Sequence, residues 1–208
     1  VRDVCGVELP LLDLGGGLGI AYTETDEPQA PQLIAQQLTA IVSSECTRSG
    51  LAMPRILVEP GRAIAGPTTM TLYEVGTIKT VELDDGLSRT YVSVDGGMSD
   101  NIRTALYDAE YTAVIANRDS DAKKVLSRVV GKHCESGDIV VRDIELPADT
   151  RPGDLIAVAA TGAYCRSMAS NYNHIPRPAA VSVAAGKSQV LLRRETIEDL
   201  LIFDAGVN

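Results

Sequence analysis

Residues 9–20 read LPLLDLGGGLGI, a short apolar run that ends in a cluster of glycines. Such a run is typical of a buried parallel strand that is followed by a tight loop. Residues 31–49 then place apolar side chains at helical spacing and end at Gly50. Residues 55–58 form a second apolar run, which leads into the sequence EPGR. This order of strand, loop, helix, strand and loop predicts a βαβ unit of an α/β domain.

The composition changes after Gly66 to one that is typical of β structure. Segments rich in Val, Ile, Thr and Tyr recur between turn residues, which predicts antiparallel strands. We expect these strands at residues 69–81, 90–94, 126–130, 139–144, 155–159, 179–183 and 189–193, followed by a helix at 195–201. The fold class is therefore α/β plus β, with residues 1–66 as the end of an α/β domain and residues 67–208 as a mostly antiparallel β domain.

Length and charge limit the classes of partner. A chain of 208 residues is long enough for one complete domain and part of another. Its net charge of -9 argues against nucleic acid or an anionic membrane as a partner, and no apolar run approaches the roughly 18 residues of a membrane helix. The cysteines form no CxxC pair, which favours the reducing cytoplasm. Because Val1 is not preceded by a methionine or a leader, we expect a part of a longer protein.

Two polar loops follow the two predicted parallel strands. The glycine run around Gly17 lets backbone amides approach a phosphate, although Ile20 stands where a dinucleotide fingerprint needs its third glycine. The alternative for this run is a simple tight turn. In the second loop, Glu59 and Arg62 are separated by a rigid turn and can serve different parts of one ligand. A surface salt bridge is the alternative there.

Three further segments carry reactive side chains. Arg103 and Tyr107 follow the loop DGGMSDN four residues apart, a spacing that lets both reach one anionic group unless they merely begin a solvated helix. In HCESGD, Cys134 can offer a proton beside the cation-binding carboxylate of Glu135, unless the thiol is only structural. Neighbouring residues rarely converge on one metal or form a Cys/His hydrolase, so we expect no metal site. In GAYCRSMASNYN, the phenol of Tyr164 can donate to a phosphate, or the segment is only a packed helix start.

Together and in this order, the five motifs GGGLG, EPGR, DGGMSDNIRTALY, HCESGD and GAYCRSMASNYN resemble the C-terminal half of the diaminopimelate decarboxylases. This family belongs to the pyridoxal-phosphate-dependent decarboxylases that have an alanine-racemase-like fold. The resemblance runs from about Leu11 to Arg194, and the triplet CES with the later NYN distinguishes it from the ornithine enzymes. One departure is Thr104, where the family commonly has proline, and we expect no consequence from it.

The resemblance implies a fold, a cofactor and a set of site residues. Residues 1–66 would be the last βα units of a (β/α)8 barrel that binds pyridoxal 5'-phosphate. Residues 67–208 would be an antiparallel β-sandwich or barrel domain that contributes to the active site and to the interface of a homodimer. The implied cofactor contacts are Gly17, Glu59, Pro60, Gly61, Arg62 and Tyr164. The implied substrate contacts are Arg62, Arg103, Tyr107, Glu135 and Tyr164. Cys134 would reach into the partner subunit's site as the proton donor.

The implied reaction converts meso-2,6-diaminopimelate to L-lysine and carbon dioxide, a step of lysine biosynthesis. Glu59 would keep the cofactor ring protonated. Arg103 and Glu135 would bind the carboxylate and the ammonium of the distal end, so that ligands lacking one of these groups would be rejected.

The family's Schiff-base lysine lies upstream of the matched region. None of the lysines present resembles it: Lys79, Lys123, Lys124, Lys132 and Lys187. We therefore expect this chain alone to form no Schiff base with the cofactor and to be inactive. Two alternatives remain open, an ornithine- or arginine-type decarboxylase and a non-catalytic dimerisation module.

Overall fold

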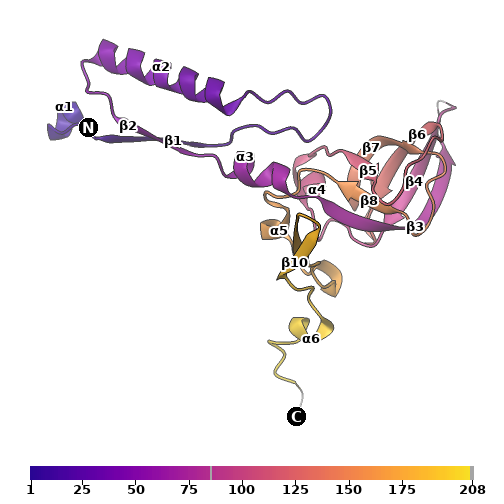
Figure 1. The fold of residues 1–208 in the computed structure, drawn as a ribbon. Coiled ribbons are helices and arrows are strands. Elements are labelled where there is room, and N and C mark those ends of the chain that lie inside the picture. Colours follow the sequence, from indigo (N-terminus) through magenta and orange to yellow (C-terminus); the bar gives the residue numbers. More distant parts are fainter. Residues whose placement is uncertain (85, 207–208) are drawn as a thin grey trace.

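The computed structural model describes residues 1–84 and 86–206. Figure 1 shows the N-terminal elements on one side and a curled sheet on the other, connected through a short helix. The N-terminal elements are α1 (Arg2–Cys5), β1 (Leu11–Gly16), α2 (Pro31–Ser49), β2 (Arg55–Glu59), α3 (Gly61–Ala65) and the 3-10 turn η1 (Gly66–Thr68).

The predicted βαβ unit is confirmed. β1 and β2 pair in parallel, from Leu11 opposite Arg55 to Asp13 opposite Leu57. Between them, α2 has the bounds that the sequence pattern indicated. Pro31 begins the helix, where a missing N–H costs nothing, and Gly50 ends it in the left-handed conformation (φ 62°).

Six of the other strands form one sheet. They are β3 (Thr71–Glu82), β4 (Ser88–Val94), β5 (Ala113–Ile115), β6 (Lys124–Val130), β7 (Ile139–Pro147) and β8 (Leu155–Val158), in the order β5-β8-β3-β4-β6-β7. All neighbours are antiparallel except β4 and β6, which are parallel, so the expectation of antiparallel pairing is wrong at that pair. The sheet curls until the edge strands β5 and β7 contact each other, which gives a nearly closed barrel.

The barrel interior holds the hydrophobic core. Buried residues alternate with more exposed ones along parts of β3, β4 and β6, as the period of a strand requires, and the most buried core residues are mainly valines. The core consists of Tyr73, Val75, Val92, Val94, Tyr111, Ala113, Val129, Val140, Val141, Leu146, Ile156, Val158 and Cys165. Arg103, Cys134, Glu135 and Tyr164 lie on loops and short helices around this barrel, whereas Gly17 and the loop 59–62 follow β1 and β2.

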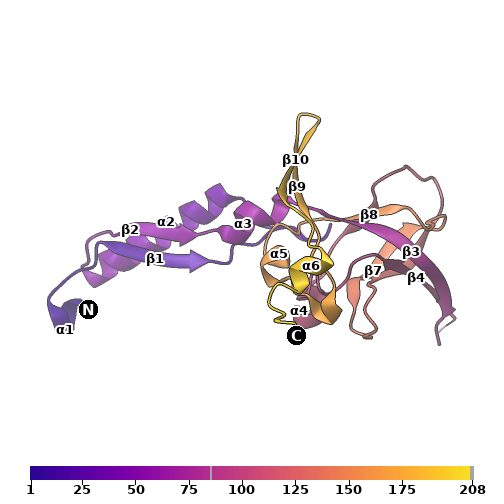
Figure 2. The ribbon, with the colours of Figure 1, turned by 90° about the horizontal axis from the view of Figure 1, so that it is seen from below.

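Short helices and a hairpin complete the chain. They are α4 (Arg103–Tyr107), α5 (Cys165–Met168), the 3-10 turn η2 (Tyr172–His174), the antiparallel strands β9 (Ala180–Ala184) and β10 (Lys187–Leu192), and α6 (Ile197–Leu200). The hairpin of β9 and β10 projects away from the barrel (Figure 2). The sequence did not predict β5 and α3, because segments of three to five residues are too short to show a hydrophobic periodicity.

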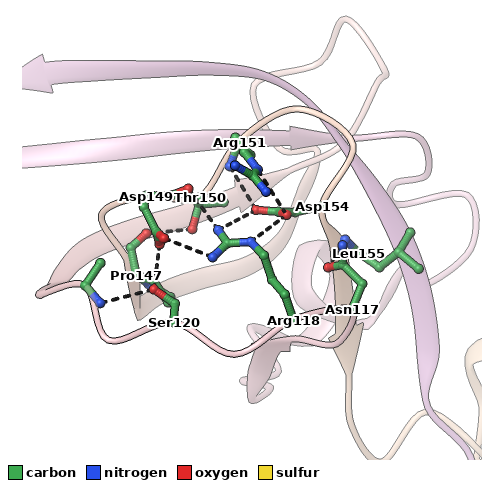
Figure 3. Close-up of polar contacts among 10 residues, drawn as sticks. Asn117, Arg118, Ser120, Pro147, Asp149, Thr150, Arg151, Asp154 and Leu155 are labelled. Atoms are coloured by element: carbon green, nitrogen blue, oxygen red, sulfur yellow. Dashed lines mark hydrogen bonds and ion pairs between the residues drawn. The ribbon is translucent and has the colours of Figure 1, made fainter.

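A buried ion pair fastens two loops at one end of the barrel (Figure 3). Nε and Nη2 of Arg118 each donate to the carboxylate of Asp154 over 2.8 Å, and the Asp154 side chain is only 2% exposed. Arg118 also donates to the carboxylate and the backbone oxygen of Asp149. The Arg118 hydrogen bonds lower the pKa of Asp154 to about 2. The loop after β5 is thereby joined to the connection between β7 and β8.

We predict that Arg118→Ala lowers the free energy of unfolding by ~3 kcal/mol, because it leaves the buried Asp154 carboxylate without its cation. Urea unfolding followed by circular dichroism measures this change. Arg151→Ala is the matched control, since Arg151 is 72% exposed and 4.0 Å from the same carboxylate. It should cost less than ~1 kcal/mol. Equal effects of the two substitutions would contradict the assigned role.

Candidate active site

The two loops at the carboxyl ends of β1 and β2 are in direct contact. Gly16 lies so close to Glu59 that an added Cβ would come within 2.1 Å of the Glu59 carbonyl oxygen. Gly15 and Gly17 adopt left-handed backbone angles (φ 71° and 80°), and an added Cβ on either would meet no atom within 4 Å. The glycine run therefore passes the neighbouring strand closely and presents open backbone beside it.

Arg62 ties these two loops together. Its Nη2 donates to the Gly17 carbonyl over 2.6 Å, and its Nε donates to the Leu18 carbonyl over 3.1 Å. The structure thus brings Gly17 together with the loop of Glu59, Pro60, Gly61 and Arg62 at the carboxyl ends of two parallel strands. The Glu59 side chain is exposed beside this junction.

Arg103 lies among three tyrosines. Its guanidinium carbon is 4.8 Å from the ring centre of Tyr22, 5.4 Å from that of Tyr164 and 5.8 Å from that of Tyr111. Its Nη1 also donates to the Tyr111 hydroxyl over 2.7 Å. Burial raises the pKa of Tyr111, so this hydroxyl stays protonated at neutral pH. Cation–π contacts of this kind hold a guanidinium in place while leaving some of its N–H groups available to a ligand.

Tyr22 and Tyr111 were not among the predicted site residues. Tyr22 follows β1 and reaches the barrel, where its carbonyl accepts from the Thr112 N–H over 2.9 Å. Tyr164, which was predicted, has a left-handed backbone (φ 69°) that is uncommon for a tyrosine and persists only when its surroundings hold it. Tyr107 is 62% exposed, and among the described residues no hydrogen bond or ring contact joins it to Arg103 or the three tyrosines, so its expected convergence with Arg103 stays a prediction.

Asp138 joins the two loops that carry the other site residues. Its carboxylate accepts from the Met98 N–H over 2.6 Å and from the His133 N–H over 2.7 Å, and the residue is 3% exposed. Gly97 and Gly131 make room for it, because a Cβ on either would lie within 2.6 Å of its carboxylate. The loops DGGMSDN and HCESGD are therefore held side by side by this buried anion, together with the bond from the Lys132 N–H to the Gly96 carbonyl over 2.9 Å and the His133–Ser99 contact.

Glu135 and Cys134 lie together at the tip of the second loop. Glu135 Oε1 accepts from the Tyr172 hydroxyl over 2.9 Å and is 3.6 Å from Cys134 Sγ. Glu135 Oε2 is buried and has no partner among the described residues. Cys134 is exposed, so the alternative of a buried structural thiol is wrong. The tip thus combines an accessible thiol with a carboxylate oxygen that a cationic ligand would satisfy.

Three further observations concern Thr104, metal sites and membrane-spanning helices. Thr104, the departure from the family pattern, is buried and donates to the Val140 carbonyl over 3.1 Å. No cluster of three or more His, Cys, Asp or Glu residues with the geometry of a metal site occurs in residues 1–84 and 86–206. In the same ranges, no helix has the length and apolarity needed to cross a membrane.

Two family descriptions match this chain. "Pyridoxal-dependent decarboxylase, C-terminal sheet domain" matches residues 38–162, and "Pyridoxal-dependent decarboxylase, pyridoxal binding domain" matches residues 2–66. The chain belongs to the family of pyridoxal-dependent decarboxylases.

Several of its relatives within that family are diaminopimelate decarboxylases. The diaminopimelate decarboxylase of Mycobacterium tuberculosis is 57% identical over an alignment of 208 positions. The alignment covers 97% of this chain and 46% of the relative. The M. jannaschii enzyme, solved in co-complex with L-lysine, superposes with a TM-score of 0.86 at 30% identity and covers 99% of this chain and 45% of that one. The Helicobacter pylori enzyme complexed with L-lysine gives a TM-score of 0.79 at 32% identity, covering 96% and 46%. The resemblance indicated by the motifs is confirmed, and the chain spans about half the length of these relatives.

We predict that Gly16→Ala destabilises the β1–β2 junction by ~3 kcal/mol, because the new methyl group would collide with the Glu59 backbone. Gly19→Ala is the control, since an added Cβ there makes only an ordinary contact of 3.9 Å with Pro28. Its effect should stay within ~1 kcal/mol. Limited proteolysis of the segment 1–66 reports the difference, and equal resistance of both variants would refute the close approach.

We predict that Asp138→Asn costs ~2 kcal/mol of unfolding free energy. An asparagine offers one acceptor oxygen to two buried N–H donors and leaves one of them unsatisfied. Asp108→Asn is the control, because the Asp108 side chain is 88% exposed and pairs at the surface with Arg142. Urea midpoints measure both, and a control effect as large as that of Asp138→Asn would contradict the anchoring role.

Proposed function

We propose that this chain is the C-terminal part of a diaminopimelate decarboxylase, which converts meso-2,6-diaminopimelate to L-lysine and carbon dioxide. We further propose that residues 1–66 complete a (β/α)8 barrel and that residues 67–208 form the β domain of the enzyme. The end of the pyridoxal-binding match at residue 66 supports this division. The observation that carries the substrate assignment is the buried, unpartnered Glu135 oxygen on one loop, with the tyrosine-held cation Arg103 on another.

The residues at the ends of β1 and β2 fit pyridoxal 5'-phosphate. Gly17 and Gly61 leave open space where a Cβ would stand, which suits a phosphate approached by backbone amides. Glu59 would pair with the ring nitrogen, while the loop from Pro60 to Arg62 and Tyr164 would complete the contacts. When bound, the cofactor's protonated ring accepts the electrons that remain when the substrate loses its carboxylate.

The distal end of diaminopimelate is a zwitterion, and the two fixed charges match it. Arg103 would bind the distal carboxylate with the N–H groups that Tyr111 leaves unused, and Glu135 Oε2 would accept from the distal ammonium. Arg62, Tyr107 and Tyr164 would face the same ligand. A ligand without the distal carboxylate would leave the Arg103 cation without a counter-charge. This disfavours ornithine and other amino acids whose distal end carries only an amine.

Cys134 is the proposed proton donor, because its thiol is exposed at a loop tip beside Glu135. We propose that the enzyme is a homodimer and that this tip, with Cys134 and Glu135, enters the partner subunit's site, so that each active site combines Arg103 of one protomer with Glu135 of the partner subunit. The cysteines of the chain are all free thiols, which supports a cytoplasmic enzyme.

We predict that the full-length gene product, supplied with pyridoxal 5'-phosphate, releases carbon dioxide from meso-2,6-diaminopimelate and forms L-lysine. Cys134→Ala should lower kcat by ~10²–10⁴-fold with little change in KM, because the reprotonation step loses its acid. Cys5→Ala, which removes another exposed thiol, should leave kcat unchanged. Faster turnover of ornithine or arginine than of diaminopimelate would overturn the proposed function.

A further inference from the structure

Tyr172 contacts the loop that carries Glu135 through both its hydroxyl and its ring. Its hydroxyl donates to Glu135 Oε1 over 2.9 Å. Its ring lies edge-on to His133, with ring centres 5.4 Å apart and an interplanar angle of 78°. Since His133 and Glu135 belong to the same loop, Tyr172 grips that loop at two points.

The partners of Tyr172 are themselves fixed. His133 is buried, and its Nε2 is 2.9 Å from the Ser99 hydroxyl. The Ser170 N–H donates to the Ser99 carbonyl over 3.0 Å, which attaches the segment before Tyr172 to the same residue. Asn173 follows with a left-handed backbone (φ 53°), a conformation that asparagine adopts more readily than most residues. The tyrosine is therefore placed by the fold rather than free to follow Glu135.

The two oxygens of Glu135 are made unequal by this contact. Oε1 is engaged by the Tyr172 hydroxyl and faces the Cys134 thiol, whereas Oε2 is buried and unpartnered within the described chain. The Tyr172 hydrogen bond also lowers the pKa of Glu135, against the opposing effect of burial, so the carboxylate is ionised at neutral pH. A buried anionic oxygen without a donor is a strong acceptor for an ammonium group.

We propose that Tyr172 is a positioning residue that orients Glu135 toward the distal ammonium of the substrate and so determines specificity for a diamino diacid. The proposal rests on the proposed function for the identity of the ligand. Tyr172 does not touch the reacting atoms. Its effect passes through Glu135, which in its absence would rotate freely and turn toward water.

The test is Tyr172→Phe in the full-length holoenzyme, because phenylalanine keeps the ring against His133 and removes only the hydroxyl. A hydrogen bond to a charged group corresponds to a roughly 10-fold effect. We expect KM for meso-2,6-diaminopimelate to rise about 10-fold while kcat changes less than about 2-fold. For 2-aminopimelate, which lacks the distal ammonium, kcat/KM should be the same in both enzymes. Tyr91→Phe is the control, since the Tyr91 hydroxyl has no hydrogen bond among the residues that the structure describes.

A double-mutant cycle separates positioning from a structural effect. In a Glu135→Gln background, Tyr172→Phe should cause almost no further rise in KM, because the group that it orients is already lost. Independent effects of the two substitutions, or equal losses for both ligands, would overturn the proposal. If the wild-type enzyme does not turn over diaminopimelate at all, the proposed function fails instead.

A readout independent of activity comes from carboxyl ¹³C NMR of the labelled chain. Glu135 should titrate below the ordinary range of glutamate in the wild type and move upward in Tyr172→Phe. Should that variant not fold, the wild-type titration still decides, because a Glu135 pKa in the ordinary range would show that Tyr172 does not hold the carboxylate.

Discussion

The buried carboxylate of Asp138 is the interaction on which the arrangement of the barrel's site loops depends. It accepts from one backbone N–H of each of two loops, at Met98 and His133, and reinforces the backbone bond from the Lys132 N–H to the Gly96 carbonyl. One loop leads to Ser99 and Arg103, and the other carries Cys134 and Glu135. A buried anion that accepts two charge-assisted hydrogen bonds fixes both loops through their backbone. The other side chains of these loops therefore remain available to the site.

Around this anchor, tyrosines hold the two charges that would bind a ligand. Arg103 lies among the rings of Tyr22, Tyr111 and Tyr164, while the Tyr172 hydroxyl holds Glu135. Rigid aromatic side chains lose little entropy on ordering, so they hold charged groups in a fixed direction at low cost. Fixed charges recognise a ligand by its complete set of opposite charges, because any missing group leaves a polar atom unsatisfied. The chemistry and the selectivity proposed for this chain both follow from that rigidity.

The sequence predicted local structure well and loop-to-loop contacts poorly. The bounds of α2 follow from helical periodicity and capping residues. The family resemblance indicated the candidate site residues, but not the hydrogen bond from Arg62 to the Gly17 carbonyl. The sequence did not predict the roles of four residues, because these roles depend on contacts between segments far apart in the chain. The four residues are Asp138, Tyr22, Tyr111 and Tyr172. The parallel pairing of β4 with β6 was missed for the same reason, since residue composition does not encode register between distant strands.

Amide hydrogen exchange of the described chain, read by NMR, tests the central role of Asp138 most directly. If Asp138 fixes both loops, the Met98 and His133 amides should exchange as slowly as the ladder amides of β4, although neither residue belongs to a strand. The amide of the exposed Gly137, in the turn between His133 and Asp138, should exchange rapidly. Exchange of Met98 and His133 at the rate of Gly137 would show that the carboxylate does not hold the loops and would contradict the account.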